Sequence, residues 1–141
     1  MKLQNSIGLL LALFVVTGCG DKSDDDAAFS APTGVTAQVV SANGEDTIEV
    51  SWTSVTDAVK YNIYMASQAG VTKLNYTTLP GQMFHPDNVA SFPHPDPAAN
   101  LDPNTIYYFI VTAVNAAGDE TAESCEAAAK IAGSVDGSCG Q

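Results

Sequence analysis

The sequence predicts an all-β fold in which antiparallel strands form a sandwich or a barrel. Between residues 31 and 132, short runs with alternating apolar side chains are separated by Gly, Pro, Asn and Asp residues, which favour turns. No pattern of helical period and useful length occurs outside the first 18 residues. The length of 141 residues fits one domain.

The clearest strand lies between Leu101 and Gly118. This segment opens with a turn signal at residues 102–104, continues through β-branched and aromatic residues, and closes with a second turn signal at residues 115–118. Successive side chains of a strand point to opposite faces, and here both faces are apolar. We therefore expect a central strand that is covered on both sides.

The remaining strands follow from the same alternation. We expect them at residues 35–39, 48–52, 61–65 and 124–131, with a weaker strand at 71–78. Lys73 would place that weaker strand at a sheet edge, because a lysine there opposes pairing with another chain. The segment 79–100 contains several prolines, which central strands exclude, so we expect a long loop with at most a short strand at residues 91–94.

These residues resemble a fibronectin type III domain over roughly residues 31–131. The resemblance rests on Pro32, on Trp52, on Tyr61-Asn-Ile-Tyr64, and on Leu101-x-Pro103-x-Thr105-x-Tyr107 followed by Phe109-x-Val111-x-Ala113-Val-Asn115 and Gly118.

The resemblance implies a seven-stranded antiparallel β-sandwich of the immunoglobulin-like type, with Trp52, Tyr61, Leu101 and Tyr107 in its structural core. Tyr107 would form a tyrosine corner, in which the hydroxyl bonds the backbone a few residues upstream. The resemblance is specific for the fold and implies no particular function, since sandwiches of this type serve many roles. The proline-rich segment 79–100 departs from it, being longer than the family norm.

The N-terminus has the features of a bacterial lipoprotein signal. A short positively charged region with Lys2 precedes an apolar run at residues 7–16, which is too short to span about 30 Å of hydrocarbon. The following Val16-Thr-Gly-Cys19 resembles the box in which the signal is cut before a cysteine that is then lipidated. An ordinary secretory signal is the alternative.

We therefore expect a signal peptide at residues 1–18 and a lipidated Cys19 that opens an acidic, flexible tether over residues 19–30. The sandwich would occupy residues 31–132, and residues 133–141 would form a C-terminal tail. Gly20 after the lipidated cysteine favours the outer membrane under the sorting rule of such lipoproteins. The expected location is the bacterial cell envelope, with the domain lipid-anchored at the outer membrane or facing the periplasm.

The charge excludes nucleic acid as a partner. The chain has 16 acidic residues against 5 lysines, no arginine, and a net charge of −11. Phosphate neutralisation requires clustered Lys and Arg, so neither nucleic acid nor anionic lipid headgroups fit this composition.

The three cysteines divide into an anchor and a pair. If Cys19 carries lipid, Cys125 and Cys139 remain together in an oxidising compartment. We predict a disulfide between them that pins the tail to the edge of the sheet. An intermolecular bridge and two free thiols remain open as alternatives.

Both histidines lie two residues before an aspartate, in His85-Pro-Asp87 and His94-Pro-Asp96. These four side chains are candidate ligands of Zn²⁺ or Cu²⁺, although their spacing matches no defined ligand motif. A small metal-binding envelope protein is therefore the alternative function, while the favoured interpretation needs no cofactor.

The sequence favours recognition over catalysis. It contains no Gly-x-Ser-x-Gly, His-Glu-x-x-His or phosphate-loop motif, so we expect no enzymatic activity. Tyr76, Met83, Phe84 and Phe92 are the candidate binding surface, unless they only hold their own loop in place. We expect a membrane-anchored extracytoplasmic binding or structural module that contacts a protein or a polysaccharide. An accessory domain of a larger enzyme complex would have the same features.

Overall fold

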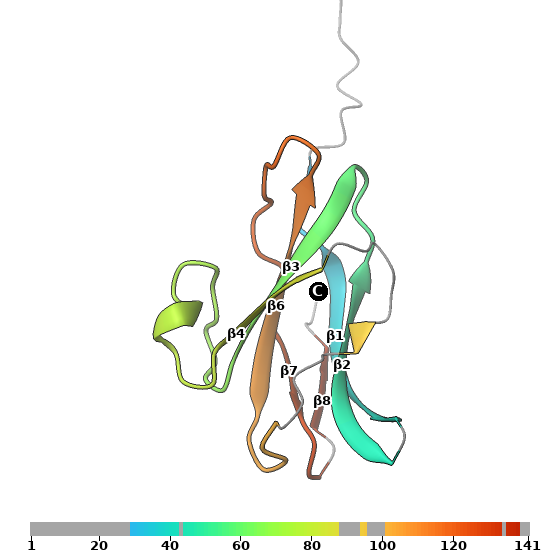
Figure 1. Ribbon diagram of the computed structural model, residues 1–141, viewed down its shortest axis with the longest axis vertical. Coiled ribbons are helices and arrows are strands. Elements are labelled where there is room, and N and C mark those ends of the chain that lie inside the picture. The colour runs from blue at the N-terminus through green and yellow to red at the C-terminus, as the bar shows by residue number, and fades with distance from the viewer. Residues whose placement is uncertain (1–28, 43, 88–93, 96–100, 134, 139–141) are drawn as a thin grey trace, which may run out of the picture.

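The fold is built almost entirely from strands (Figure 1). In this computed structural model, the described residues are 29–42, 44–87, 94–95, 101–133 and 135–138. The elements are β1 (Thr33–Ala42), β2 (Glu45–Thr53), β3 (Ala58–Ala66), the 3₁₀ helix η1 (Tyr76–Thr78), β4 (Met83–Asp87), β5 (His94–Pro95), β6 (Tyr107–Asn115), β7 (Ala127–Lys130) and β8 (Val135–Ser138). Within these ranges, no helix is long and apolar enough to cross a membrane.

The strands form two layers, and all of their pairings are antiparallel. One layer has the order β4-β3-β6-β7, and the other has the order β1-β2-β5. β8 pairs with β7 on one side and with β1 on the other, so it joins the two layers along one flank. The predicted antiparallel β-sandwich is therefore confirmed, with one joining strand more than the prediction contained.

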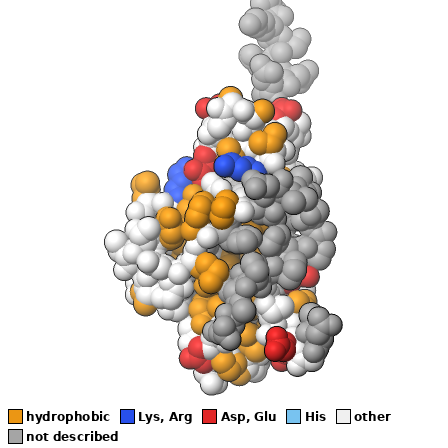
Figure 2. Space-filling view, in the orientation of Figure 1, with side chains coloured by type: hydrophobic (Ala, Val, Ile, Leu, Met, Phe, Trp, Pro, Cys, Tyr) orange, Lys and Arg blue, Asp and Glu red, His pale blue; other side chains and the backbone are white. Residues whose placement is uncertain are grey.

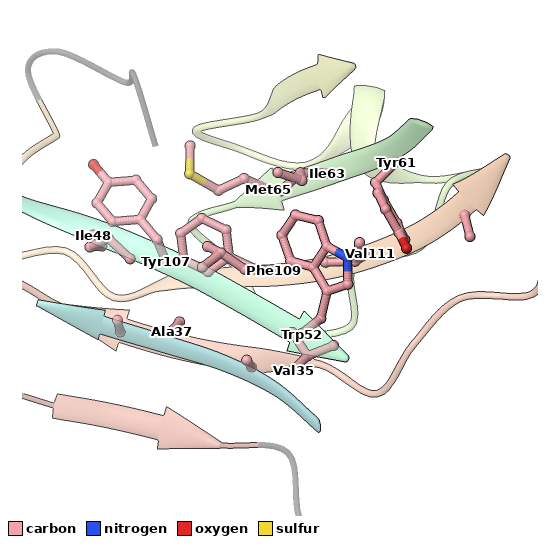
Figure 3. Packing of buried hydrophobic residues seen from close by; sticks show 14 residues of the cluster. Val35, Ala37, Ile48, Trp52, Tyr61, Ile63, Met65, Tyr107, Phe109 and Val111 are labelled. Atoms are coloured by element: carbon pink, nitrogen blue, oxygen red, sulfur yellow. The ribbon is translucent and has the colours of Figure 1, made fainter. Parts of the chain in front are cut away.

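The core lies between the layers and follows the alternation of the sequence (Figure 3). It consists of buried side chains from β1, β2, β3, β6 and β7: Val35, Ala37, Ile48, Val50, Trp52, Tyr61, Ile63, Met65, Tyr107, Phe109, Val111, Ala113, Ala127 and Ala129. The rings of Trp52 and Tyr61 pack edge to face with their centroids 5.1 Å apart, a favourable aromatic geometry. Leu101 packs against this core from its margin.

β6 is the central strand that the run of residues 101–118 predicts. It pairs with β3 on one side and with β7 on the other. Phe109 and Val111 point into the core, while Ile110 and Thr112 are buried on the opposite face. Burial on both faces explains why this run shows little polar alternation.

The turn before β6 contains a tyrosine corner. The hydroxyl oxygen of Tyr107 accepts a hydrogen bond from the backbone N–H of Asp102, with 3.0 Å between nitrogen and oxygen. The Asp102 carboxylate in turn accepts hydrogen bonds from the Asn104 N–H and the Thr105 hydroxyl. These bonds fix the entry into β6 and place Tyr107, which is 7% exposed, at the edge of the core.

The prediction of a strand at residues 71–78 is wrong. The segment instead contains turns and the helix η1. Its turn is held by a reciprocal pair, in which the Thr72 N–H donates to Asn75 Oδ1 and the Asn75 N–H donates to Thr72 Oγ1. Such local side-chain bonds offer the backbone an alternative to a strand ladder.

The edge strand beside β3 is β4, which lies inside the segment that was predicted to be a loop. Met83, Phe84 and His85 pair with Met65, Tyr64 and Ile63 of β3. Among the described strands β4 pairs only with β3, and an edge strand tolerates Pro86 because one of its sides needs no donor. The proline argument therefore excluded a central strand there but not an edge strand.

Three boundaries differ from the predictions. The last predicted strand, at residues 124–131, is shorter and is β7. The short strand predicted at residues 91–94 corresponds to β5, and residues 91–93 lie outside the described part of the chain. Residues 133–141 were predicted as a tail, yet part of this segment forms β8. β8 passes so close to β7 that a Cβ atom added to Gly137 would lie 2.5 Å from the carbonyl oxygen of Ala128, so only glycine fits there.

Candidate functional site

The outer face of the layer that contains β3 and β4 carries three stacked rings. The ring of Tyr64 on β3 lies 4.9 Å from that of Tyr76 in η1 and 5.0 Å from that of Phe84 on β4, between centroids. The rings of Tyr76 and Phe84 are 5.9 Å apart. Tyr64 is buried, Tyr76 is half-buried, and Phe84 is 41% exposed. We call these three residues the aromatic surface.

A second, smaller apolar cluster supports the aromatic surface. Tyr64, Ala66, Val71 and Ile110 are its buried members, and Tyr76, Leu79 and Tyr108 pack against it. The connection between β3 and β4, residues 67–82, contributes three of these seven residues and covers the outer faces of β3 and β6. Because this connection buries its own apolar side chains, it is a packed part of the fold.

Glu120 lies in the connection between β6 and β7 and accepts hydrogen bonds from polar side chains of this face. Its Oε1 atom accepts hydrogen bonds from Asn62 Nδ2 at 2.9 Å, from the Tyr64 hydroxyl at 2.8 Å and from the Thr112 hydroxyl at 2.5 Å. Asn62 and Tyr64 lie on β3, and Thr112 lies on β6. One carboxylate therefore satisfies three donors from two neighbouring strands, and all three donor residues are buried.

These contacts change the acidity of both partners. Burial alone would raise the pKa of Glu120, but the hydrogen bonds from Thr112, Asn62 and Tyr64 and the charge of Lys73 together hold its pKa below the ordinary value. Burial, and then the hydrogen bond to Glu120, raise the pKa of the Tyr64 hydroxyl far above its ordinary value. At neutral pH the glutamate is therefore charged and the tyrosine remains a donor.

Two further glutamates fix the connection of residues 67–82. Glu126 Oε2 accepts hydrogen bonds from the N–H groups of Gly70 and Val71, both at 2.8 Å. Glu123 Oε1 accepts from the N–H of Lys73 at 3.3 Å. Lys73 Nζ donates to the Thr121 carbonyl oxygen at 2.9 Å. The position of the connection is thus set by hydrogen bonds from the segment between β6 and β7.

The structure describes three of the four residues of the predicted binding surface, and these three do not share one face. Tyr76 and Phe84 lie together in the aromatic surface. Met83 neighbours Phe84 on β4, but it packs against the inner core, since successive strand residues face opposite sides. Phe92 lies outside the described residues.

Sequence reasoning missed the role of Glu120. A glutamate beside Asp119 in a turn has the pattern of an ordinary solvated residue, and its partners Asn62 and Tyr64 are far away in sequence. One signal was available for the turn of residues 72–75: Thr-x-x-Asn places two side chains that bond the backbone at the spacing of a reciprocal cap.

The surface around this site mixes apolar and charged groups. Figure 2 shows hydrophobic side chains near the centre of the visible face, bordered by lysine and acidic side chains. Besides Phe84, the large hydrophobic residues that are exposed in the described part of the chain are Val59, Leu74 and Ile106, at 50%, 86% and 37%. The three hydrogen bonds that Glu120 accepts give this residue a structural role in the face.

The candidate metal ligands are placed only in part. His85 and Asp87 lie on β4, which pairs with β3, whereas His94 lies on β5, which pairs with β2. Asp96 falls outside the described residues. In the described ranges, no group of three or more His, Cys, Asp or Glu side chains is arranged to hold a metal ion. The metal site stays a prediction that no observation in the structure favours.

The remaining predicted residues have simple positions. Trp52 and Tyr61 lie in the inner core, and the Tyr61 hydroxyl accepts a hydrogen bond from the Val55 N–H at 2.8 Å. Cys125 is an exposed residue two positions before β7. Cys19 and Cys139 lie outside the described residues, so the lipid anchor and the disulfide stay predictions.

A two-layer antiparallel sandwich with a buried tryptophan on its second strand and a tyrosine corner before its central strand defines a class of immunoglobulin-like modules. The fibronectin type III family model matches residues 30–129, and the chain belongs to this family. The crystal structure of an Fn3-like protein from Clostridium thermocellum is similar, with 26% identity and a TM-score of 0.52. The match covers 72% of this chain and 92% of that one. No curated protein matches the sequence.

Proposed function

We propose that this protein is a membrane-anchored extracytoplasmic binding module whose aromatic surface contacts a protein or a polysaccharide. Fibronectin type III domains are generally non-catalytic binding or structural modules, which supports the general class. The proposal goes further in assigning the contact to Tyr76 and Phe84 and in assigning no catalytic activity to the domain.

The exposure of Phe84 is the observation that carries this proposal. A phenylalanine ring that is 41% exposed loses part of the stabilisation that burial would give it. Its neighbours Tyr64 and Tyr76 fix the ring in place, so binding would cost little conformational entropy. A rigid aromatic group of this kind is a frequent anchor of binding interfaces.

The charge of the molecule limits the kind of partner. With a net charge of −11, the chain repels anionic surfaces and favours neutral or cationic ones. Glu120, Glu123 and Glu126 lie in the segment next to the aromatic surface and strengthen this preference. A neutral polysaccharide or a protein with a basic contact region meets both conditions.

The partner can be found with the protein in detergent. We would cross-link the solubilised lipoprotein to its neighbours in the membrane fraction and recover the products. Phe84→Ala should reduce recovery of a specific partner at least tenfold, while Val59→Ala, which trims another exposed side chain on β3, should leave it unchanged. Equal recovery with both variants would show that the contact lies elsewhere.

The anchor and the location belong to the same proposal. The apolar run of residues 7–16, followed by Gly18 and Cys19, supports a lipidated cysteine at the start of the mature chain. An acyl chain contributes about 0.8 kcal/mol per buried CH₂, so two or three chains would hold the domain at a bilayer of the cell envelope. Labelled palmitate should enter the wild-type protein but not Cys19→Ser, and absence of label from the wild type would overturn the anchor.

A further inference from the structure

The carboxylate of Glu120 has one oxygen engaged and one oxygen open. Its Oε1 atom accepts the three hydrogen bonds from Asn62, Tyr64 and Thr112, which fix the orientation of the group. Its Oε2 atom has no hydrogen-bond partner among the described residues, and Glu120 is exposed. A carboxylate oxygen is an acceptor with two lone pairs, so Oε2 can accept hydrogen bonds from a ligand.

Lys73 brings an opposite charge to the same place. Its Nζ atom donates to the Thr121 carbonyl oxygen at 2.9 Å, which ties the ammonium group to the residue next to Glu120. The charge of Lys73 is one cause of the lowered pKa of Glu120, so the two groups are near enough to interact. An ammonium group has three N–H donors, and the contact with Thr121 uses one of them.

These two charged groups continue the aromatic surface. The ring of Tyr64 lies 5.0 Å from that of Phe84, and the hydroxyl of Tyr64 lies 2.8 Å from Glu120 Oε1. Lys73 lies beyond Glu120 and is joined to it through Thr121. The contacts thus run from a partly exposed apolar ring to a hydrogen-bond acceptor and then to a hydrogen-bond donor.

We propose that Phe84, Glu120 and Lys73 form a subsite for a neutral polysaccharide. The ring of Phe84 stacks on the C–H face of one sugar unit, because the negative face of an aromatic ring attracts C–H groups. Glu120 Oε2 accepts a hydrogen bond from a sugar hydroxyl, and Lys73 Nζ donates one to another hydroxyl. The inference rests on the proposed binding function and selects one of its two candidate partners. We call these three residues the sugar subsite.

The paired charges decide the chemistry of the ligand. A basic protein segment would bring its charge against Lys73, and an anionic sugar would bring its charge against Glu120, and like charges in an interface are costly. A hydroxyl group both donates and accepts, so a neutral sugar satisfies both side chains at once. The net charge of −11 also repels anionic polysaccharides. Because Glu120 is already held by three hydrogen bonds, its ordering on binding costs little entropy.

Native gels that contain a soluble polysaccharide test the sugar subsite. The full-length lipoprotein in a neutral detergent would be run through gels with a β-glucan, a mannan or a xylan as neutral probes. Polygalacturonate serves as the anionic probe. At least one neutral polysaccharide should retard the wild type, and polygalacturonate should not. The retardation at several concentrations gives the affinity.

The variants test each member of the subsite. Phe84→Ala and Phe84→Leu should both weaken the affinity at least tenfold, and the leucine variant keeps apolar bulk for packing while it removes the ring. Glu120→Gln keeps Oε1 as an acceptor for its three donors but replaces Oε2 by an amide NH₂ group, and about tenfold weaker binding is expected. Lys73→Met should have a similar effect. Lys130→Met, which removes a half-buried lysine of β7, is its matched control and should bind like the wild type. Melting curves identify any variant that does not fold.

Three outcomes would overturn the inference, and they bear differently on the proposed function. If no neutral polysaccharide retards the wild type while Phe84→Ala still loses a cross-linked protein partner, the sugar subsite is wrong and the binding module stands. If a polysaccharide binds folded Phe84→Leu and Glu120→Gln as well as it binds the wild type, the aromatic surface is not the contact. Equal retardation by polygalacturonate would show that the charge pair does not select neutral sugars.

Discussion

The two faces of β3 and β6 are built in different ways. On the inner face, Tyr61, Phe109 and Val111 interlock with the opposite layer, and burial of apolar area supplies the stabilisation. On the outer face, a small apolar cluster is combined with a carboxylate, Glu120, that satisfies three donors. The inner face is the core between the two layers of the fibronectin type III sandwich. The outer face depends on particular long-range contacts, and these position the aromatic surface.

Removal of a large inner side chain should have the largest effect. Phe109 is fully buried, so Phe109→Ala would leave a cavity and should lower the free energy of unfolding by about 3–5 kcal/mol. Urea denaturation of the purified domain measures this loss. A loss below about 1 kcal/mol would mean that the inner face is not the main source of stability.

Glu120→Ala should cost less, because the site is partly open to water. The variant leaves the buried donors of Asn62 and Thr112 without their acceptor, which should cost about 1–2 kcal/mol. Glu45→Ala, at an exposed acidic residue of β2, is the matched control and should cost less than about 0.5 kcal/mol. If both variants unfold at the same urea concentration as the wild type, the outer network contributes no stability.

Tyr107→Phe isolates a single hydrogen bond at the margin of the inner face. The variant keeps the ring and removes the hydroxyl that accepts from the Asp102 N–H, so the free energy of unfolding should fall by about 1 kcal/mol. Denaturation experiments on the two proteins side by side give the difference. An unchanged value would show that Tyr107 serves only as a core ring.

Acid should weaken the outer face by the smallest amount. The pKa of Glu120 is lowered in the folded state, so its contribution to stability is present above the ordinary pKa of 4.5 and is lost as the pH falls through the lower folded pKa. Between pH 5 and pH 2.5 the wild type should therefore lose more stability than Glu120→Ala. Parallel curves for the two proteins over this interval would show that the charge of Glu120 does not matter.

The inner face could be predicted well from the sequence. β6 and its turns follow from apolar alternation between two clusters of turn residues, and Trp52 and Tyr61 fall on core positions of neighbouring strands. The tyrosine corner is encoded within residues 101–107, so local sequence suffices to predict it. Local patterns carry this information because strand period and turn chemistry are short-range properties.

The outer face could be predicted only in part. The rings of Tyr76 and Phe84 lie 5.9 Å apart, whereas Met83, which was assigned to the same surface, faces inward. That error came from interpreting residues 79–100 as a loop, in which neighbouring side chains can share a side. Once β4 is known to be a strand, the two-residue period separates Met83 from Phe84.

The long-range hydrogen bonds could not be predicted from the sequence. Nothing in the residues around Glu120 or Glu126 shows that their carboxylates reach β3 and the turn after it. β8 was not predicted either, because Val135–Ser138 is short and contains Gly137, which weakens any strand pattern. Only the close approach to Ala128 in the folded chain explains the need for glycine at that position.

The binding affinity of Phe84→Ala tests the central claim about the outer face most directly. Phe84 is partly exposed, so its truncation should lower the free energy of unfolding by less than Phe109→Ala does, while it removes the anchor of the contact. Measured by calorimetry against the partner recovered by cross-linking, the variant should bind about 30-fold more weakly, a loss of about 2 kcal/mol. Val59→Ala should bind like the wild type. Equal affinities of all three proteins would contradict the account and leave the aromatic surface with a purely structural role.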